Sequence, residues 1–208
     1  FRSDSKEVIM WPSSSIMEID LLTDNIKNMV NSLRFSFIKL KESQDKLYRQ
    51  AYYDSLTNLP NRLFFKKYLK DEIKDCENRI CVMFMDLNRF KTINDTMGHD
   101  IGDKLLVLVA ERLKSLQDEK HHIFRLGGDE FVIVSKVNSI EEIKNDGIRA
   151  VEIFKEKFIL EDKFSVKITG SIGASIYPQD GTDIDKIIKY ADIAMYESKC
   201  NGGRSEEH

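Results

Sequence analysis

The stretch from residue 125 to residue 131, with the sequence RLGGDEF, combines residue types that can bind a cation. Gly127 and Gly128 lie between β-favouring segments and can take positive φ angles, so they predict a β-hairpin. Asp129 and Glu130 then follow just past its tip. Adjacent carboxylates repel each other, and a hairpin needs only the glycines. The pair therefore indicates a nearby cation, and a solvated acidic turn is the alternative.

A second carboxylate, Asp86, follows the apolar run Arg79–Met85, which predicts a central strand buried on both faces. Two carboxylates on neighbouring strands suit Mg²⁺, which takes hard oxygen ligands and usually only one or two protein carboxylates. Basic residues that could contact phosphate groups accompany them: Lys91, Arg125, Lys199 and Arg204. These residues by themselves predict a Mg²⁺-dependent phosphoryl- or nucleotidyl-transfer site.

Composition sets the limits of the prediction. With 208 residues, 41% hydrophobic and 32% charged, the chain is long enough for one folded domain and an appendage. A net charge of −3 gives no general affinity for nucleic acid. The 3 cysteines form no C-x-x-C pair, which disfavours disulfides and zinc and fits a reducing cytosol. The sequence contains no run of 18 apolar residues, so no membrane span is predicted.

A long helix is predicted before this domain. Apolar residues recur at alternating steps of three and four, without Pro or Gly, and three positions of the seam are polar. The seam consists of Ile19, Leu22, Ile26, Met29, Leu33, Ser36, Leu40, Ser43, Leu47 and Gln50. We expect a parallel two-stranded coiled coil that holds two copies together; an amphipathic helix folded back on its own domain is the alternative. The segment also faintly resembles the second helix of a HAMP linker.

The remaining elements predict an α/β (α+β) fold with a central mixed, mainly antiparallel sheet flanked by helices. Asn61 is the expected N-cap of the first helix of the domain. The expected elements are helix 62–75, strand 79–85, short helix 92–97, a helix from 102 or 103, the hairpin, helix 140–158, strand 164–177 and a helix from 183 through 199. No nucleotide-binding glycine loop of the Rossmann or P-loop type occurs.

The expected organisation has four parts. They are an irregular segment 1–17, a signalling helix 18–53, a domain 54–204 and a probable tag remnant 205–208. The missing initial Met predicts that the sequence is a fragment.

Five motifs occur in order between residues 54 and 199. They are DxLTxLPNR from Asp54, FMDLNxFKxIND from Phe84, GHxxGD from Gly98, RxGGDEF from Arg125 and ADxAMYxxK from Ala191. Together they resemble the GGDEF family of diguanylate cyclases. The resemblance implies a fold like that of nucleotide cyclases and polymerase palms. It also implies a homodimer that condenses two GTP into cyclic di-GMP and two pyrophosphates with Mg²⁺, or with Mn²⁺ as an alternative.

The resemblance also implies roles for individual residues. Asp86, the Leu87 carbonyl and Asp129 would bind the metal, and Asp129 or Glu130 would act in catalysis. The substrate would be bound through two sets of groups. Guanine would contact Asn94 and Asp103; phosphates and ribose would lie near Lys91, Lys199, the main-chain N–H groups of Arg89 and Phe90, and the side-chain-free Gly127 and Gly128.

Three of these residues also have a purely structural interpretation. Asn94 could be a helix C-cap, Asp103 an N-cap, and Lys199 a solvated cation at a helix end. Asp54 and Arg62 are expected to form an ion pair at the start of the domain.

Two departures from the family pattern matter. Residues 118–121, with the sequence DEKH, stand where many relatives carry the inhibitory R-x-x-D, so no inhibitory site is expected. Arg204 lies five residues after Lys199 rather than four, which leaves its phosphate role in doubt.

The leading hypothesis is the cytoplasmic output domain of a membrane-attached sensor. It would bind GTP, release cyclic di-GMP and bind no nucleic acid. A catalytically silent GTP-binding regulatory module is the alternative, and a cyclase that makes a 3′,5′-cyclic monophosphate is a third, disfavoured hypothesis.

Overall fold

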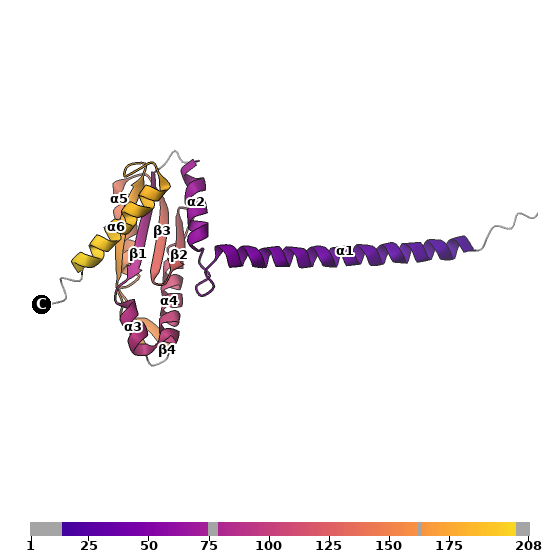
Figure 1. The fold of residues 1–208 in the computed structure, drawn as a ribbon, viewed down its shortest axis with the longest axis horizontal. Coiled ribbons are helices and arrows are strands. Elements are labelled where there is room, and N and C mark those ends of the chain that lie inside the picture. The colour runs from indigo at the N-terminus through magenta and orange to yellow at the C-terminus, as the bar shows by residue number, and fades with distance from the viewer. Residues whose placement is uncertain (1–13, 75–78, 162–163, 203–208) are drawn as a thin grey trace, which may run out of the picture. The chain divides into compact units, whose positions relative to one another are not determined.

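The structure is a computed structural model that describes residues 14–74, 79–161 and 164–202 (Figure 1). Most of the irregular segment 1–17, Cys76, Arg204 and the predicted tag remnant lie outside the described residues. The chain divides into two compact units, Phe1–Tyr48 and Arg49–His208.

Helix α1, Ser14–Tyr52, runs without interruption over 39 residues. This confirms the expected long N-terminal helix. The seam residues Ile19, Leu22, Ile26, Met29, Leu33, Leu40 and Leu47 are all exposed. Coiled-coil pairing therefore stays a prediction. None of the described helices has the length and apolar character that a membrane span requires.

The second unit is built on a four-stranded sheet in the order β2-β3-β1-β6. These strands are β2 His121–Gly127, β3 Glu130–Val137, β1 Arg79–Leu87 and β6 Gly170–Tyr177. The three strand pairs are antiparallel. The expected α+β class is thus confirmed.

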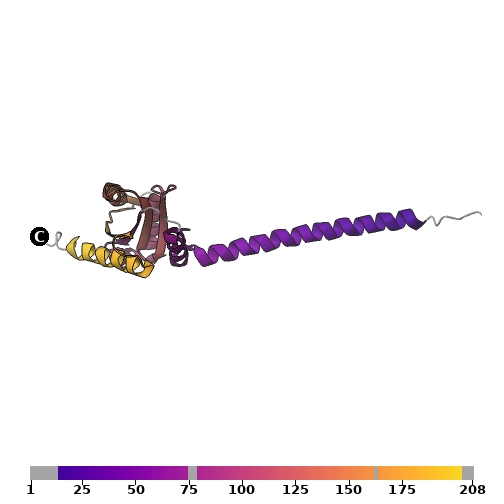
Figure 2. The same cartoon turned by 90° about the horizontal axis from the view of Figure 1, so that it is seen from above.

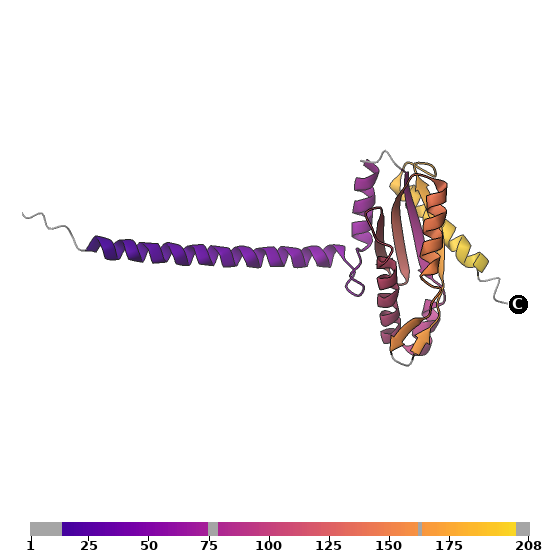
Figure 3. The same ribbon diagram turned by 180° about the vertical axis from the view of Figure 1, so that it is seen from behind.

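Strand β1 lies in the middle of the sheet and feeds two cores. Cys81, Met83 and Met85 pack into one core with α4, His99–Lys114, and α5, Ile140–Glu152. The β1 residues that alternate with these three point to the other face of the sheet. They pack into a second core with α2, Arg62–Lys74, and α6, Ile184–Gly202. Helices therefore cover both faces of the sheet (Figure 2). Helix α6 lies in front in Figure 1, and α5 lies in front of the opposite face in Figure 3.

Several expected elements were wrong in extent, and α4 begins at His99 rather than at 102 or 103. The helix predicted over 140–158 ends at Glu152, and the strand predicted over 164–177 is divided into β5, Phe164–Val166, and β6. Strand β5 pairs instead with β4, Phe158–Glu161, in a separate two-stranded sheet. Short helix α3, Phe90–Met97, starts two residues earlier than expected.

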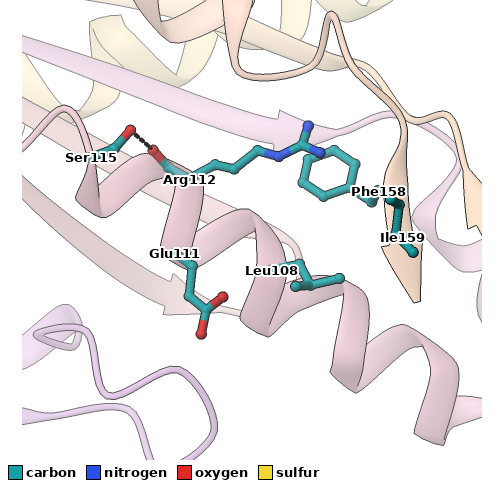
Figure 4. Close-up of a pocket in the computed structure, with 6 residues that line it drawn as sticks. All are labelled: Leu108, Glu111, Arg112, Ser115, Phe158 and Ile159. Atoms are coloured by element: carbon teal, nitrogen blue, oxygen red, sulfur yellow. Dashed lines mark hydrogen bonds between the residues drawn. The ribbon is translucent and has the colours of Figure 1, made fainter. Parts of the chain in front are cut away.

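Arg112 on α4 gives a physical reason for the early end of α5. Its guanidinium donates to the carbonyl oxygens of Ile153 at 2.7 Å, Glu156 at 2.6 Å and Lys157 at 2.6 Å. It also lies 3.7 Å from the ring centroid of Phe158 (Figure 4). These carbonyls are held by a distant side chain, so the backbone leaves the helix and turns into β4.

Candidate active site

The hairpin between β2 and β3 forms a tight turn with Gly128 and Asp129 between the strands. Gly127 and Gly128 have φ angles of 141° and 54°, a region that favours glycine. A Cβ at either glycine would meet no atom within 4 Å of the described structure. The predicted hairpin is confirmed, with Asp129 in the turn itself. The open space beside the glycines can admit a ligand.

Arg125 fixes this turn through hydrogen bonds from its guanidinium. Its Nη2 and Nε donate to the Gly128 carbonyl at 2.8 and 3.2 Å, and its Nη1 donates to Asp54 Oδ1 at 2.6 Å. The Arg125 side chain is only 7% exposed. Three of its five N–H groups are used in these bonds. With the side chain buried as well, the suggestion from the residues alone that Arg125 contacts phosphate finds no support in the structure.

Asp54 is well satisfied in return. Besides Arg125, its Oδ1 accepts from the Thr57 N–H at 2.8 Å and the Thr57 hydroxyl at 2.6 Å. Burial works to raise the pKa of this carboxyl, but the Thr57 hydrogen bonds and Arg125 lower it overall. The corner formed by Asp54, Thr57, Arg125 and the Gly128 carbonyl is called the anchoring corner below.

The expected ion pair between Asp54 and Arg62 was wrong. Arg62 Nη2 instead lies 3.1 Å from Glu130 Oε2, at the start of β3. Asn61 does cap α2, as predicted, because its Oδ1 accepts from the N–H groups of Leu63 and Phe64. Both members of the expected pair thus contact residues near the turn rather than each other, and they link the first segment of the domain to the hairpin.

The strand register brings Asp86 to the same place. Asp86 on β1 is paired with Glu130 on β3 and with Ser171 on β6. Lys199 on α6 donates to Asp86 Oδ1 at 2.5 Å, and the side chains are 41% and 13% exposed. The alternative of a merely solvated Lys199 is wrong in this structure. The group of Asp86, Asp129, Glu130 and Lys199 is called the acidic corner below.

Two carboxyl groups of the acidic corner, those of Asp129 and Glu130, have a raised pKa. Burial raises the pKa of Asp129, and the nearby charge of Asp86 adds to this effect. Burial also raises the pKa of Glu130; Arg62 opposes the rise, and Asp192 on α6 adds to it. Sequence reasoning missed Asp192 as a member of this field, although it lies within the last of the five motifs. The carboxylates lie in a field that favours a bound cation.

These carboxylates fit a hard cation whose remaining ligands come from other groups than the protein's carboxylates. In the described ranges, no group of three or more His, Cys, Asp or Glu side chains could hold a metal alone. Asp86 and Asp129 supply carboxylate oxygens, and the ammonium of Lys199 already lies against one of them. Mg²⁺ commonly uses one or two carboxylates, with waters and substrate phosphates as its other ligands.

The segment after β1 is fixed by a small hydrogen-bond network. Asn88 donates from its N–H to the Thr169 carbonyl and from Nδ2 to Thr169 Oγ1, and it accepts from Ser171 Oγ. Arg89 then adopts a left-handed conformation, with a φ angle of 60°, at the N-cap of α3. Phe90 is buried and Lys91 is exposed. The first turn of α3 therefore follows Asp86 closely in the chain, with Phe90 inside and Lys91 exposed.

Asn94 and Asp103 lie on α3 and α4. Gly98 is the C-cap of α3 and the N-cap of α4, so the capping alternatives for both residues are wrong. Asn94 Oδ1 is buried and has no hydrogen-bond partner among the described residues. A buried acceptor without a donor costs free energy, which indicates a role outside the fold itself.

The comparison with known proteins decides the family. The family model described as diguanylate cyclase, GGDEF domain, matches residues 51–205. This chain belongs to the GGDEF family. The diguanylate cyclase TpbB of Pseudomonas aeruginosa is 32% identical over 192 residues, which cover 90% of this chain and 44% of that protein. The cyclic di-GMP phosphodiesterase NbdA of the same species is 36% identical, over 79% of this chain and 21% of the relative.

Solved structures agree on the fold of this GGDEF protein. The coiled coil and GGDEF domain of DgcB from Caulobacter crescentus, in complex with c-di-GMP, has a TM-score of 0.75 and 25% identity, covering 85% of this chain and 95% of that one. The GGDEF domain of TpbB from Pseudomonas aeruginosa has a TM-score of 0.69 and 33% identity, covering 72% and 90%. This chain spans 21–44% of the length of the first curated relatives that it matches.

In this GGDEF domain, residues 118–121 stand where many relatives carry the inhibitory motif, and their side chains contact neighbouring residues of the same chain. Asp118 Oδ1 accepts from the N–H groups of Lys120 and His121 and lies 2.6 Å from His121 Nδ1. His121 Nε2 lies 3.0 Å from Asp146 Oδ1. Burial of Asp118 opposes these contacts, yet they lower its pKa to about 2. Two carboxylates therefore surround His121 at this position, where an arginine would be needed for an anionic ligand.

Proposed function

We propose that this chain is a diguanylate cyclase domain that condenses two GTP into cyclic di-GMP and two pyrophosphates. The observation that carries the proposal is the acidic corner. Asp86, Asp129 and Glu130 gather beside two glycines with open space, and the raised pKa values of Asp129 and Glu130 favour a bound cation. Family membership supports the choice of reaction.

Asp86, Asp129 and the Leu87 carbonyl would hold Mg²⁺, with Mn²⁺ as an alternative. Bound there, the metal supplies charge stabilisation at the α-phosphate. The 3′-oxygen of each GTP attacks the α-phosphorus of the other. Each attack breaks the bond to the β-phosphate, so two phosphodiester bonds form and two pyrophosphates leave. Asp129 and Glu130 are the proposed acceptors of the 3′-hydroxyl proton, because raised pKa values favour proton uptake.

The substrate contacts are proposed from the neighbouring elements. Asn94 and Asp103 would bind the guanine edge, which offers both donors and an acceptor. Adenine would leave Asp103 without donors. Lys91, Lys199 and the N–H groups of Arg89 and Phe90 would bind phosphates, as the start of a helix favours anions. Gly127 and Gly128 would let the ribose or triphosphate approach the backbone.

The enzyme is proposed to act as a homodimer, since each site binds one GTP and the product needs two. The exposed seam of α1 would pair the two chains and raise the local concentration of their domains. Leu22→Asp, on the seam, should weaken the dimer, whereas its neighbour Leu21→Asp, off the seam, should not. Light scattering measures the mass of each variant. Equal dimerisation of both variants would contradict the coiled coil.

The remaining expectations are also proposals. The domain would act in the cytoplasm as part of a membrane-attached sensor protein, with its own boundaries at residues 54 and 204. Because Asp118 and His121 contact each other and Asp146, we propose that no product-inhibition site exists there. Cyclic di-GMP that inhibited noncompetitively through Asp118 would contradict this.

The deciding experiment is an incubation of the dimeric protein with GTP and Mg²⁺, followed by chromatography of the nucleotides. Cyclic di-GMP should form with the wild type and not with Asp129→Ala. GTP binding without any product would support the alternative, a silent regulatory module. A 3′,5′-cyclic monophosphate would identify the third reaction type instead.

A further inference from the structure

Gly102 occupies a position where a side chain has no room. It lies in the first turn of α4 and is buried. A Cβ built on it would overlap Asn94 Oδ1, lie 2.9 Å from Asn94 Cγ and lie 3.2 Å from Phe90 Cζ. Both neighbours belong to α3, where they are one helical turn apart. The missing Cβ therefore leaves the space that the Asn94 amide fills.

The backbone gives no other reason for glycine here. Gly102 lies within the regular helix α4, and its φ angle is not in the left-handed region, unlike those of Gly98, Gly127 and Gly128. Glycine inside a helix weakens it relative to alanine. The atoms that would obstruct a Cβ are side-chain atoms, and no backbone atom is among them. The fold would tolerate alanine if the Asn94 amide rotated away.

We propose that Gly102 is a positioning residue that sets the guanine specificity of the site through Asn94. This inference rests on the proposed function, because Asn94 is the proposed guanine contact. With Gly102, the amide lies against the first turn of α4, next to the carboxylate-bearing Asp103. With a Cβ there, the amide must leave that position while the helix and Asp103 stay in place. The site would then keep its phosphate and metal groups but lose one of its two guanine contacts.

The test uses four proteins: wild type, Gly102→Ala, Asn94→Ala and the double variant. Calorimetry with Mg²⁺ measures the affinity of each for non-hydrolysable analogues of GTP and ATP. Gly102→Ala should weaken binding of the GTP analogue about 10- to 100-fold and leave the ATP analogue unchanged. In the Asn94→Ala background, Gly102→Ala should add no further loss, since the amide is already gone.

Gly147 provides the matched control. It also lies within a helix, α5, but a Cβ there would meet nothing within 4 Å of the described structure. Gly147→Ala should bind both analogues like the wild type. Thermal unfolding of Gly102→Ala should occur near the wild-type temperature.

Three results would overturn the inference while leaving the proposed function standing. The first is wild-type affinity of Gly102→Ala for the GTP analogue. The second is an equal, additive loss in the Asn94→Ala background. The third is a large drop in unfolding temperature in both backgrounds, which would assign Gly102 to packing against Phe90. A wild type that binds no GTP analogue would overturn the proposed function as well.

Discussion

Asp54 and Asp129 have opposite electrostatic surroundings, although Arg125 links Asp54 to the turn that carries Asp129. Asp54, in the anchoring corner, accepts hydrogen bonds from Thr57 and Arg125, and its pKa is lowered despite burial. Asp129, in the acidic corner, has a pKa raised by burial and by Asp86. The Gly128 carbonyl, between them in the chain, is bound by Arg125. One turn thus lies beside a carboxyl group with a lowered pKa and carries another with a raised pKa.

The difference separates structural from functional charge. Where hydrogen bonds and an arginine meet a carboxylate, its charge favours the folded state. Where burial and a neighbouring like charge raise the pKa of a carboxyl group, its ionised form costs the folded state stability, and a bound cation can restore it. Arg125 supports the acidic corner, because it fixes the turn that carries Asp129. The comparison therefore predicts that mutations in the two corners affect different quantities.

Asp129→Asn should have the largest effect on activity and little effect on folding. The substitution keeps the shape but removes a metal-binding charge, so cyclic di-GMP formation should fall at least about 1000-fold, equivalent to about 4 kcal/mol. Because a like charge beside Asp86 is removed, the urea midpoint should stay level or rise. Product chromatography and urea unfolding in metal-free buffer measure the two effects. A clear loss of stability would show that the Asp129 carboxylate stabilises the fold as Asp54 does.

Arg125→Met should show the opposite pattern and lose stability first. It leaves Asp54 without its cation and the Gly128 carbonyl without its donors, which should cost about 2 to 4 kcal/mol. Urea unfolding measures this cost. Arg62→Met is the matched control, since its ion pair with Glu130 is half exposed and should contribute less than about 1 kcal/mol. Equal losses in both variants would contradict a special role for the anchoring corner.

The pH dependence of stability should differ in sign between the corners. The lowered pKa of Asp54 means that its contribution is present above the usual value of 3.8 and is lost as pH falls through its folded-state pKa. The raised pKa of Asp129 means that the folded state holds its proton longer, so stability falls as pH rises above 3.8 through its folded-state pKa.

Urea midpoints measured against pH without metal test both signs. Asp54→Asn should flatten the acid side of the curve, and Asp129→Asn should flatten the fall on the other side. Identical curves for the two variants would show that the corners are not electrostatically distinct.

The sequence predicted the acidic corner better than the anchoring corner, for a physical reason. The apolar run of β1 and the glycines of the hairpin are local signals, so strand, turn and the meeting of Asp86 with the hairpin could be expected. The partner of Arg125 is 71 positions away in sequence. Its choice depends on how the segment before α2 lies against β2, and no local pattern encodes that.

The same limit applies to the elements that were wrong in extent. Helix α5 ends early because Arg112, 41 positions from Ile153, takes the carbonyl groups that follow the helix. The strand at 164–177 is divided because β5 pairs with β4 and β6 pairs with β1. Both depend on tertiary contacts, which periodicity alone cannot show.

Lys199→Met should give the smallest effect, a change in the metal affinity of the acidic corner. In the free protein the Lys199 ammonium lies against Asp86, the position proposed for the metal, so a metal ion must displace it. Removing it should therefore tighten Mn²⁺ binding without nucleotide by about two- to fivefold, as the pair is partly exposed. The same variant should bind GTP more weakly, because Lys199 is also a proposed phosphate contact.

Paramagnetic resonance of free Mn²⁺ measures the metal affinity directly. Lys189→Met, an exposed lysine on the same helix, is the matched control and should leave that affinity unchanged. Opposite changes in metal and GTP affinity would show that Lys199 serves first as a cation for Asp86 and then as a cation for the substrate. Unchanged or weaker Mn²⁺ binding in Lys199→Met would show instead that the lysine helps to shape the metal site and does not compete with the metal for Asp86.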